Sequence, residues 1–240
     1  MAPTLLLTRP TEASDRFAAQ VRACLGDAIK VVVAPLIAPR FLDPDLPQVI
    51  LSGRARGLLF TSETGVAGFA RISADRSLPA YCVGTRTAQA ATEAGFRACA
   101  LGGDADRMVA ALQAMAPAAP LVHARGVDAR GDLAARLTAS GLPTQEIVVY
   151  DQREQPLSAF ALALLAGSAP VVVPLFSPRT AALFAAVATG ARAPLHLAAI
   201  SAAAAEPLKG MGAALRIAAE PTAESMLAAV LTLWRDIPAA

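Results

Sequence analysis

The sequence predicts an α/β fold of doubly wound parallel sheets, with helices on both faces of each sheet. Two observations predict it. Short apolar runs alternate with longer helical segments along the 240 residues, and one set of motifs occurs twice. Hydrophobic residues make up 55% of the chain and charged residues 17%, a composition that supports a large buried core and argues against disorder.

Strands are expected where runs rich in β-branched residues and leucine are short and bounded by turn-forming residues. In chain order they cover 4–8, 29–34, 57–61, 80–83, 97–101, 120–124, 144–150, 171–175, 195–199 and 214–218. Helices are expected between them, where apolar residues recur at helical spacing. They cover 12–25, 45–53, 64–74, 86–95, 105–115, 128–140, 157–167, 179–189, 201–209 and 222–234.

Four motifs of the first half recur in the same order in the second half. The pairs are TLLLTRP (4–10) with PLVHARG (120–126), KVVVAP (30–35) with EIVVYD (146–151), LLFTSETG (58–65) with PLFSPRTA (174–181), and YCVGTRTAQAATEAGF (81–96) with LAAISAAAAEPLKGMG (197–212). The offset is about 116 residues each time, which indicates one duplication and two similar lobes, since a solenoid repeats at a shorter period. The proline-punctuated segments 31–44 and 147–156 indicate two extended connectors between the lobes.

Charge and cysteine content exclude several classes of function. The net charge of +2, with no block of like charges, argues against nucleic-acid or membrane-surface binding as the main activity. Cys24, Cys82 and Cys99 show no CxxC spacing, which is typical of reduced thiols in a cytoplasmic protein. We expect neither a signal peptide nor a membrane span, because the first apolar run is short and lacks a preceding basic region.

Cofactor and metal signatures are missing from the sequence. No segment matches GxGxxG, GxxxxGK[ST] or GxSxG, so dinucleotide binding, P-loop phosphoryl transfer and serine-hydrolase chemistry have no support. His123 and His196 lack a second ligand nearby in the sequence, so we expect no metal site.

Five strand ends run directly into helix starts that carry small, hydroxyl-bearing or basic residues. In a doubly wound sheet such points lie at the carboxyl ends of the strands, where ligands bind and helix N–H groups attract anions. The candidate binding residues there are Arg9, Thr61, Ser62, Thr64, Gly65, Gly84, Thr87, Arg125, Arg130, Ser177 and Arg179. For any single loop the alternatives are helix capping by Ser or Thr and a solvated surface arginine. If the loops share one cleft, they would bind a ligand with many carboxylates.

Tyr150, one of two tyrosines, ends a strand where the chain leaves its lobe. A phenol there can donate a proton at neutral pH, so Tyr150 is the candidate catalytic residue. The alternative is a half-buried packing residue with a hydrated hydroxyl group.

Taken together, these motifs resemble the uroporphyrinogen-III synthase family. The resemblance rests on TRP at 8–10, LLFTSETGV (58–66), YCVGTRTAQAATEAGF (81–96), Tyr150, PLFSPRTAALF (174–184) and PTAESMLAAV (221–230), in the family's order over nearly the whole chain. It implies two flavodoxin-like lobes joined by a two-stranded connector, the first lobe being discontinuous. The implied bounds are 1–35 and 155–240 for lobe one, 40–148 for lobe two, and 36–39 and 149–154 for the connectors.

The resemblance also implies an activity. Members of the family close hydroxymethylbilane, a linear tetrapyrrole with eight carboxylates, to uroporphyrinogen III in tetrapyrrole (haem, sirohaem, cobalamin or chlorophyll) biosynthesis. The terminal pyrrole ring is inverted and water is lost, so the enzyme would be a hydro-lyase that needs no cofactor. We expect a cytoplasmic monomer with a small-molecule substrate and no nucleic-acid or membrane partner.

The family's functional residues map onto Tyr150, Thr87, Ser62 and Ser177, and its tyrosine is thought to help the terminal hydroxyl group leave. This chain departs from the family where relatives often have glycine and threonine, because it carries Ser201 and Ala204. Either the threonine hydroxyl is dispensable, or Ser201 replaces it as a binding residue, or activity is reduced. Two alternatives to the synthase stay open. One is a non-catalytic, two-lobed binding module for an anionic small molecule, and the other is a partner-binding scaffold with an exposed apolar patch.

Overall fold

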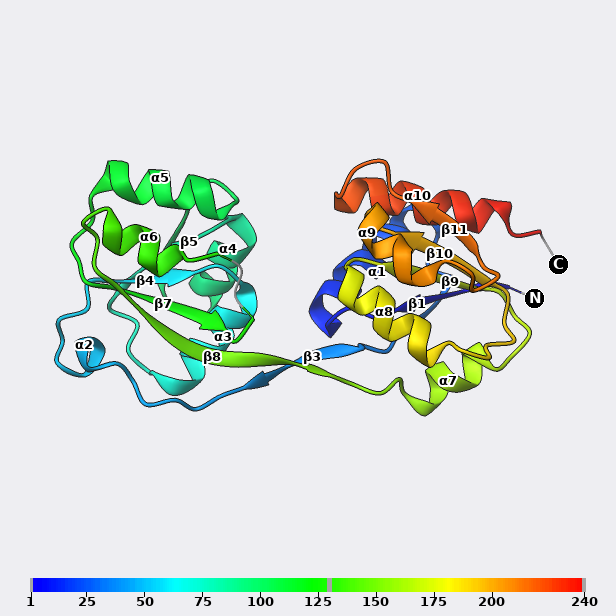
Figure 1. The fold of residues 1–240 in the computed structure, drawn as a ribbon, viewed down its shortest axis with the longest axis horizontal. Coiled ribbons are helices and arrows are strands. Elements are labelled where there is room, and N and C mark those ends of the chain that lie inside the picture. Colours follow the sequence, from blue (N-terminus) through cyan, green and yellow to red (C-terminus); the bar gives the residue numbers. More distant parts are fainter. Residues whose placement is uncertain (1, 129–130, 239–240) are drawn as a thin grey trace. The chain divides into compact units, whose positions relative to one another are not determined.

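The computed structural model describes residues 2–128 and 131–238, and Figure 1 shows its elements in chain order. The chain divides into two compact units. Unit 1 holds the residues up to Ala38 and those from Arg153 onward, and unit 2 is Pro39–Gln152. The chain crosses between them in β3 (Ile37–Phe41) and β8 (Thr144–Glu154), which are neighbours at the edge of one sheet. An edge position tolerates Pro39, which cannot donate a hydrogen bond to a partner strand.

Unit 1 is a five-stranded parallel sheet covered by helices on both faces. The strand order is β11-β10-β9-β1-β2. The strands are β1 (Thr4–Leu7), β2 (Lys30–Val33), β9 (Val171–Leu175), β10 (Leu195–Ala199) and β11 (Ala214–Ile217). The helices of one face are α1 (Thr11–Leu25) and α10 (Ala223–Asp236), and those of the other are α7 (Ala159–Leu165), α8 (Pro178–Val187), α9 (Ala202–Ala205) and the 3₁₀ turn Glu206–Leu208.

The two faces of this sheet bury alternate residues of each strand. Leu5 and Leu7 belong to one apolar cluster with Phe17 of α1, whereas Leu6 between them belongs to the cluster of Phe184 on α8. This alternation is the period of two that a strand imposes on its side chains.

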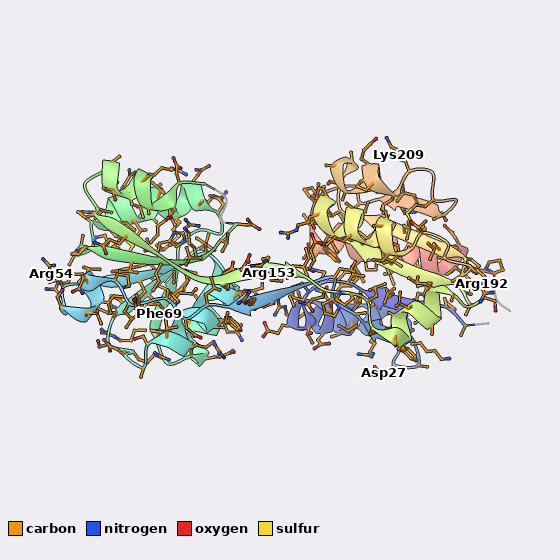
Figure 2. All side chains as sticks on the ribbon, turned by 60° about the horizontal axis from the view of Figure 1, so that its bottom comes forward. Asp27, Arg54, Phe69, Arg153, Arg192 and Lys209 are labelled. Atoms are coloured by element: carbon orange, nitrogen blue, oxygen red, sulfur yellow. The ribbon has the colours of Figure 1, made fainter. Side chains whose placement is uncertain are left out.

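Unit 2 has a six-stranded sheet in the order β3-β8-β7-β4-β5-β6. Its other strands are β4 (Gly57–Phe60), β5 (Pro79–Cys82), β6 (Arg97–Ala100) and β7 (Leu121–Gly126). Its helices are α2 (Gln48–Leu51), α3 (Glu63–Ile72), α4 (Thr85–Glu93), α5 (Ala105–Met115) and α6 (Leu133–Ala139). The core on the α3 and α4 face is aromatic, with the rings of Phe60 and Phe69 6.0 Å apart. Figure 2 shows Phe69 inside this unit and Arg54 at its surface.

The duplicated halves of the sequence exchange strands between the units. By the repeat, β1 and β2 correspond to β7 and β8, and β9 to β11 correspond to β4 to β6. The two orders, β2-β1-β9-β10-β11 and β8-β7-β4-β5-β6, therefore place corresponding strands at corresponding positions. With the edge strand β3 of unit 2 set aside, each sheet combines two strands of one repeat with three of the other, in the flavodoxin-like order 2-1-3-4-5. The doubly wound fold with flavodoxin-like sheets and a two-stranded connector is thus confirmed.

Several predicted helices are shorter than expected, and each has a local cause. Of the segment 128–140, the part from Gly131 onward forms a helix over Leu133–Ala139, and the left-handed φ of 79° at Gly131 keeps that residue out of the helix. The segment 201–209 is an α-helix only as far as Ala205, because Pro207 lacks the N–H that a continuous helix needs.

Candidate active site

Ser62 lies at the carboxyl end of β4 and begins α3. Its Oγ accepts a hydrogen bond from Gly65 N at 2.9 Å, which is the N-cap interaction that serine favours. The same Oγ lies 3.2 Å from the hydroxyl oxygen of Tyr150, so the cap also holds the phenol. A Cβ on Gly65 would lie 2.9 Å from the Ala124 carbonyl oxygen, so a glycine there lets α3 start directly against β7.

Tyr150 sits against the backbone of the neighbouring strand. A Cβ on Gly126 would be 2.6 Å from Cζ and 3.0 Å from the hydroxyl oxygen of Tyr150, so the ring covers this glycine. The β7–β8 register shifts between Arg125 and Gly126, which brings Gly126 opposite Tyr150. Val127 N donates to Tyr150 O at 2.9 Å and fixes the strand beyond the shift. The phenol is therefore half-buried, and its contacts with Gly126 and Ser62 fix its position.

Four further polar residues form a network on the α5 and α6 face of the same sheet. His123 Nε2 lies 3.3 Å from Thr61 Oγ1, and His123 Nδ1 lies 3.7 Å from Glu146 Oε1. Glu146 Oε2 is 2.8 Å from Nε of Arg125, whose Nη1 also donates to the backbone oxygen of Gly126. We call Thr61, His123, Glu146 and Arg125 the strand-end network.

His123 is the buried member of this network, with only 3% of its surface exposed. Burial lowers the pKa of His123 from 6.5 to about 4; the nearby carboxylate of Glu146 opposes this shift and the guanidinium of Arg125 adds to it. The imidazole is therefore neutral at pH 7, and its Nδ1 makes no hydrogen bond to any described residue. A neutral ring leaves Glu146 to neutralise Arg125.

Replacing His123 with leucine is expected to flatten the dependence of stability on pH between about pH 6.5 and pH 4. In this window the unfolded chain binds a proton at His123 that the folded protein does not bind. The wild type therefore loses stability as the pH falls, by on the order of 1.4 kcal/mol per pH unit more than the variant. Thermal unfolding of both proteins from pH 7 to pH 4 measures this difference, and parallel curves would contradict it.

The structure brings most of the predicted binding residues of unit 2 to the carboxyl ends of the parallel strands of its sheet. Thr61, Ser62, Thr64 and Gly65 follow β4, and Gly84 and Thr87 follow β5. Arg125 is the last residue but one of β7, and Tyr150 lies within β8, which continues to Glu154 beyond the strand end expected at Tyr150. Thr87 is buried within the first turn of α4, and Gly84 is the residue before that helix. Arg130 lies outside the described residues.

The predicted residues of unit 1 also follow strand ends, but their contacts are mostly those of helix caps. Ser177 Oγ accepts from Thr180 N at 3.1 Å, and Ser201 Oγ accepts from Ala204 N at 3.3 Å. Arg9 stacks its guanidinium on the Phe176 ring at 4.0 Å from the centroid. Arg179 Nη2 lies 3.8 Å from Glu154 Oε1 in an exposed pair. Ala204 itself is fully buried in the apolar core.

Sequence reasoning missed one part of the site. It considered His123 only as a metal ligand and did not consider Glu146, although the duplication aligns His123 with Leu7, an apolar core residue. A histidine at an aligned core position was the available signal. No three His, Cys, Asp or Glu side chains gather as a metal site within the described part of the chain, and no described helix is long and apolar enough to cross a bilayer.

Comparison with known proteins identifies one family. Residues 18–228 match the family described as uroporphyrinogen-III synthase HemD. The crystal structure of uroporphyrinogen-III synthetase from Helicobacter pylori superposes with a TM-score of 0.63 at 16% identity, over 97% of this chain and all of that one. A mutant uroporphyrinogen III synthase from Thermus thermophilus gives a TM-score of 0.48 at 14% identity, over 98% of this chain and all of that one. No curated protein sequence matches significantly.

Proposed function

This chain belongs to the uroporphyrinogen-III synthase family, and from that premise we propose that it cyclises hydroxymethylbilane to uroporphyrinogen III. The reaction closes a linear tetrapyrrole with inversion of its last pyrrole ring and loss of water. The observation that carries the proposal, besides the family match, is the contact between Tyr150 and Ser62 at the carboxyl end of the unit 2 sheet. A hydroxyl group held at that position can donate a proton to a leaving hydroxyl.

The substrate itself supplies the electrons for the reaction. The nitrogen lone pair of a pyrrole expels the terminal hydroxyl group while Tyr150 supplies the proton, so that water leaves and an azafulvenium cation forms. The phenolate of Tyr150 regains a proton when the closed ring system loses one and becomes aromatic again. The substituted carbon of the terminal ring attacks this cation, and the resulting spiro intermediate fragments and recloses with the ring inverted. The protein must fold the bilane and select the attacking carbon, which is positioning work.

The carboxylates of the bilane need many hydrogen-bond donors. Helices α3, α4 and α8 begin at strand ends, where their first N–H groups and positive dipole ends favour anions. Arg9 and Arg125 add guanidinium groups at the ends of β1 and β7. Backbone donors explain how a protein with a net charge of only +2 binds a polyanion.

We propose that the protein is a hydro-lyase that needs no cofactor, because the substrate's own nitrogen supplies the electrons. We also propose that it acts in the cytoplasm as a monomer, without a nucleic-acid partner. The binding-module alternative gains no support from any specific contact of the described residues.

The proposed activity is tested by supplying hydroxymethylbilane to the purified protein and separating the uroporphyrinogen isomers. We expect the type III isomer, whereas bilane alone closes to the symmetric isomer. Formation of only the symmetric isomer in the presence of the protein would refute the proposal.

A further inference from the structure

The strand-end network lies at positions that the other unit fills with apolar residues. The duplication aligns Leu7 of β1 with His123 of β7. The sheet register, and not the sequence repeat, sets the next correspondence: Leu7 pairs with Val33 and His123 pairs with Glu146, so Val33 occupies the place of Glu146. The sequence repeat alone would align Glu146 with Lys30. Ser62 and Ser177 are the N-cap residues of α3 and α8, so the residues just before them, Thr61 and Phe176, occupy corresponding places.

Unit 1 therefore provides a control for unit 2 within the same molecule. Leu7, Val33 and Phe176 pack in the apolar cluster of α1 and α10, with Leu7 fully buried and Phe176 5.1 Å from Phe17. The fold thus accepts three apolar residues at the places where unit 2 has Thr61, His123 and Glu146. A buried imidazole without a hydrogen bond at Nδ1 costs stability, so the fold does not explain its presence.

Arg125 is the member of the network that can reach a ligand. Its side chain is 23% exposed, and its Nε and Nη1 face Glu146 and the backbone oxygens of Gly126 and Val127. Its Nη2 forms no hydrogen bond or ion pair with any described residue, so the N–H groups of this nitrogen can donate to a ligand. Glu146 is 34% exposed, so this ion pair adds little to stability. Arg125 Nε has no hydrogen-bond partner among the described residues, so Glu146 holds the guanidinium by its charge, while the Nη1 hydrogen bonds to the backbone orient the group.

The remaining contacts place the His123 ring against Glu146 without a hydrogen bond between them. His123 Nδ1 lies beside the second carboxylate oxygen of Glu146, and its Nε2 is held by Thr61 at the residue before Ser62. The network thereby connects the end of β4, where the Ser62–Tyr150 pair lies, with Arg125 at the end of β7.

We propose that Glu146 and His123 are positioning residues. They orient Arg125 so that the N–H groups of its Nη2 bind a carboxylate of the substrate. This role rests on the proposed synthase activity and assigns one carboxylate of the polyanion to a side chain. Glu146 acts through Arg125 and does not touch the substrate itself.

A double-mutant cycle tests the role, using Glu146→Val, Arg125→Ala and the double variant with hydroxymethylbilane as substrate. A charge-assisted hydrogen bond corresponds to roughly 10–100-fold in binding, so Arg125→Ala should raise KM by at least about tenfold with a smaller change in kcat. Glu146→Val should raise KM by nearly as much, and the double variant should be no worse than Arg125→Ala alone. His123→Leu should raise KM less.

A matched control is the ion pair of Arg136 Nη2 with Asp106 Oδ1, also 2.8 Å long, between α6 and α5. Asp106→Ala should leave KM unchanged. Thermal unfolding shows whether each variant is folded, and Glu146→Gln, which keeps an acceptor for Arg125 without the charge, should give an intermediate KM even if Glu146→Val unfolds.

Two results would overturn the positioning role alone: an unchanged KM in folded Glu146→Gln or Glu146→Val, or full additivity of the Glu146 and Arg125 effects. A wild-type protein that forms no type III isomer would instead overturn the proposed activity, and this role with it. The wild-type assay therefore separates the two failures.

Discussion

Tyr150→Phe is expected to lower kcat for uroporphyrinogen III formation by about 10²–10⁴-fold, the range typical of one well-placed acid. The phenylalanine ring still covers Gly126 and keeps the packing of the strand end, but the proton donor and its contact with Ser62 are lost. KM and the melting temperature should change little, because the removed atom neither fills the core nor binds a carboxylate. Initial rates and isomer ratios with hydroxymethylbilane measure the effect.

Tyr81→Phe is the matched control, since Tyr81 is the other tyrosine of the chain and lies in β5 of the same unit. Its ring packs against Gly57 at the amino end of β4, away from the strand ends that form the site. This variant should keep kcat. Equal loss in both variants, or a Tyr150→Phe enzyme with full kcat, would remove Tyr150 from the mechanism.

Gly126→Ala is expected to reduce kcat by about 100-fold, because misplacing a catalytic group by roughly 1 Å has this effect. The new methyl group would lie 2.6 Å from Cζ and 2.7 Å from Cε2 of Tyr150, so the ring must move away from Ser62. The backbone at Gly126 carries no positive φ, so the variant acts through the ring and not through backbone strain. Overpacking of this kind costs about 1–3 kcal/mol of stability, which denaturant unfolding can measure.

Gly57→Ala reproduces the same steric conflict elsewhere, with its Cβ 2.7 Å from Cε2 of Tyr81. It should lose comparable stability and keep kcat. A second check combines Gly126→Ala with Tyr150→Phe. If the glycine acts by placing the phenol, the double variant should be no slower than Tyr150→Phe, whereas multiplied losses would show an independent effect.

Local sequence predicted the regular elements well where burial is complete on both faces. Strands 171–175 and 195–199 match β9 and β10, since each is a short, mostly apolar run that begins directly after a proline. The helix limit was wrong at 201–209, where the run of alanines suggested a longer helix than Pro207 permits. The duplication was visible as well, but by itself it did not show that the repeats exchange strands between sheets; only the family resemblance implied this, through the discontinuous first lobe of 1–35 and 155–240.

The sequence by itself determined the α/β class, the duplication, the strand ends that carry polar residues, and the serines that cap the helices following them. These features depend on residues close together along the chain, so the spacing of residue types in the sequence is enough to predict them. Only the tertiary structure decided that Ser62 meets Tyr150, 88 residues away, and that His123 lies between Thr61 and Glu146. Such contacts depend on the register and order of strands from distant segments, and a shift of one residue turns each side chain to the opposite face.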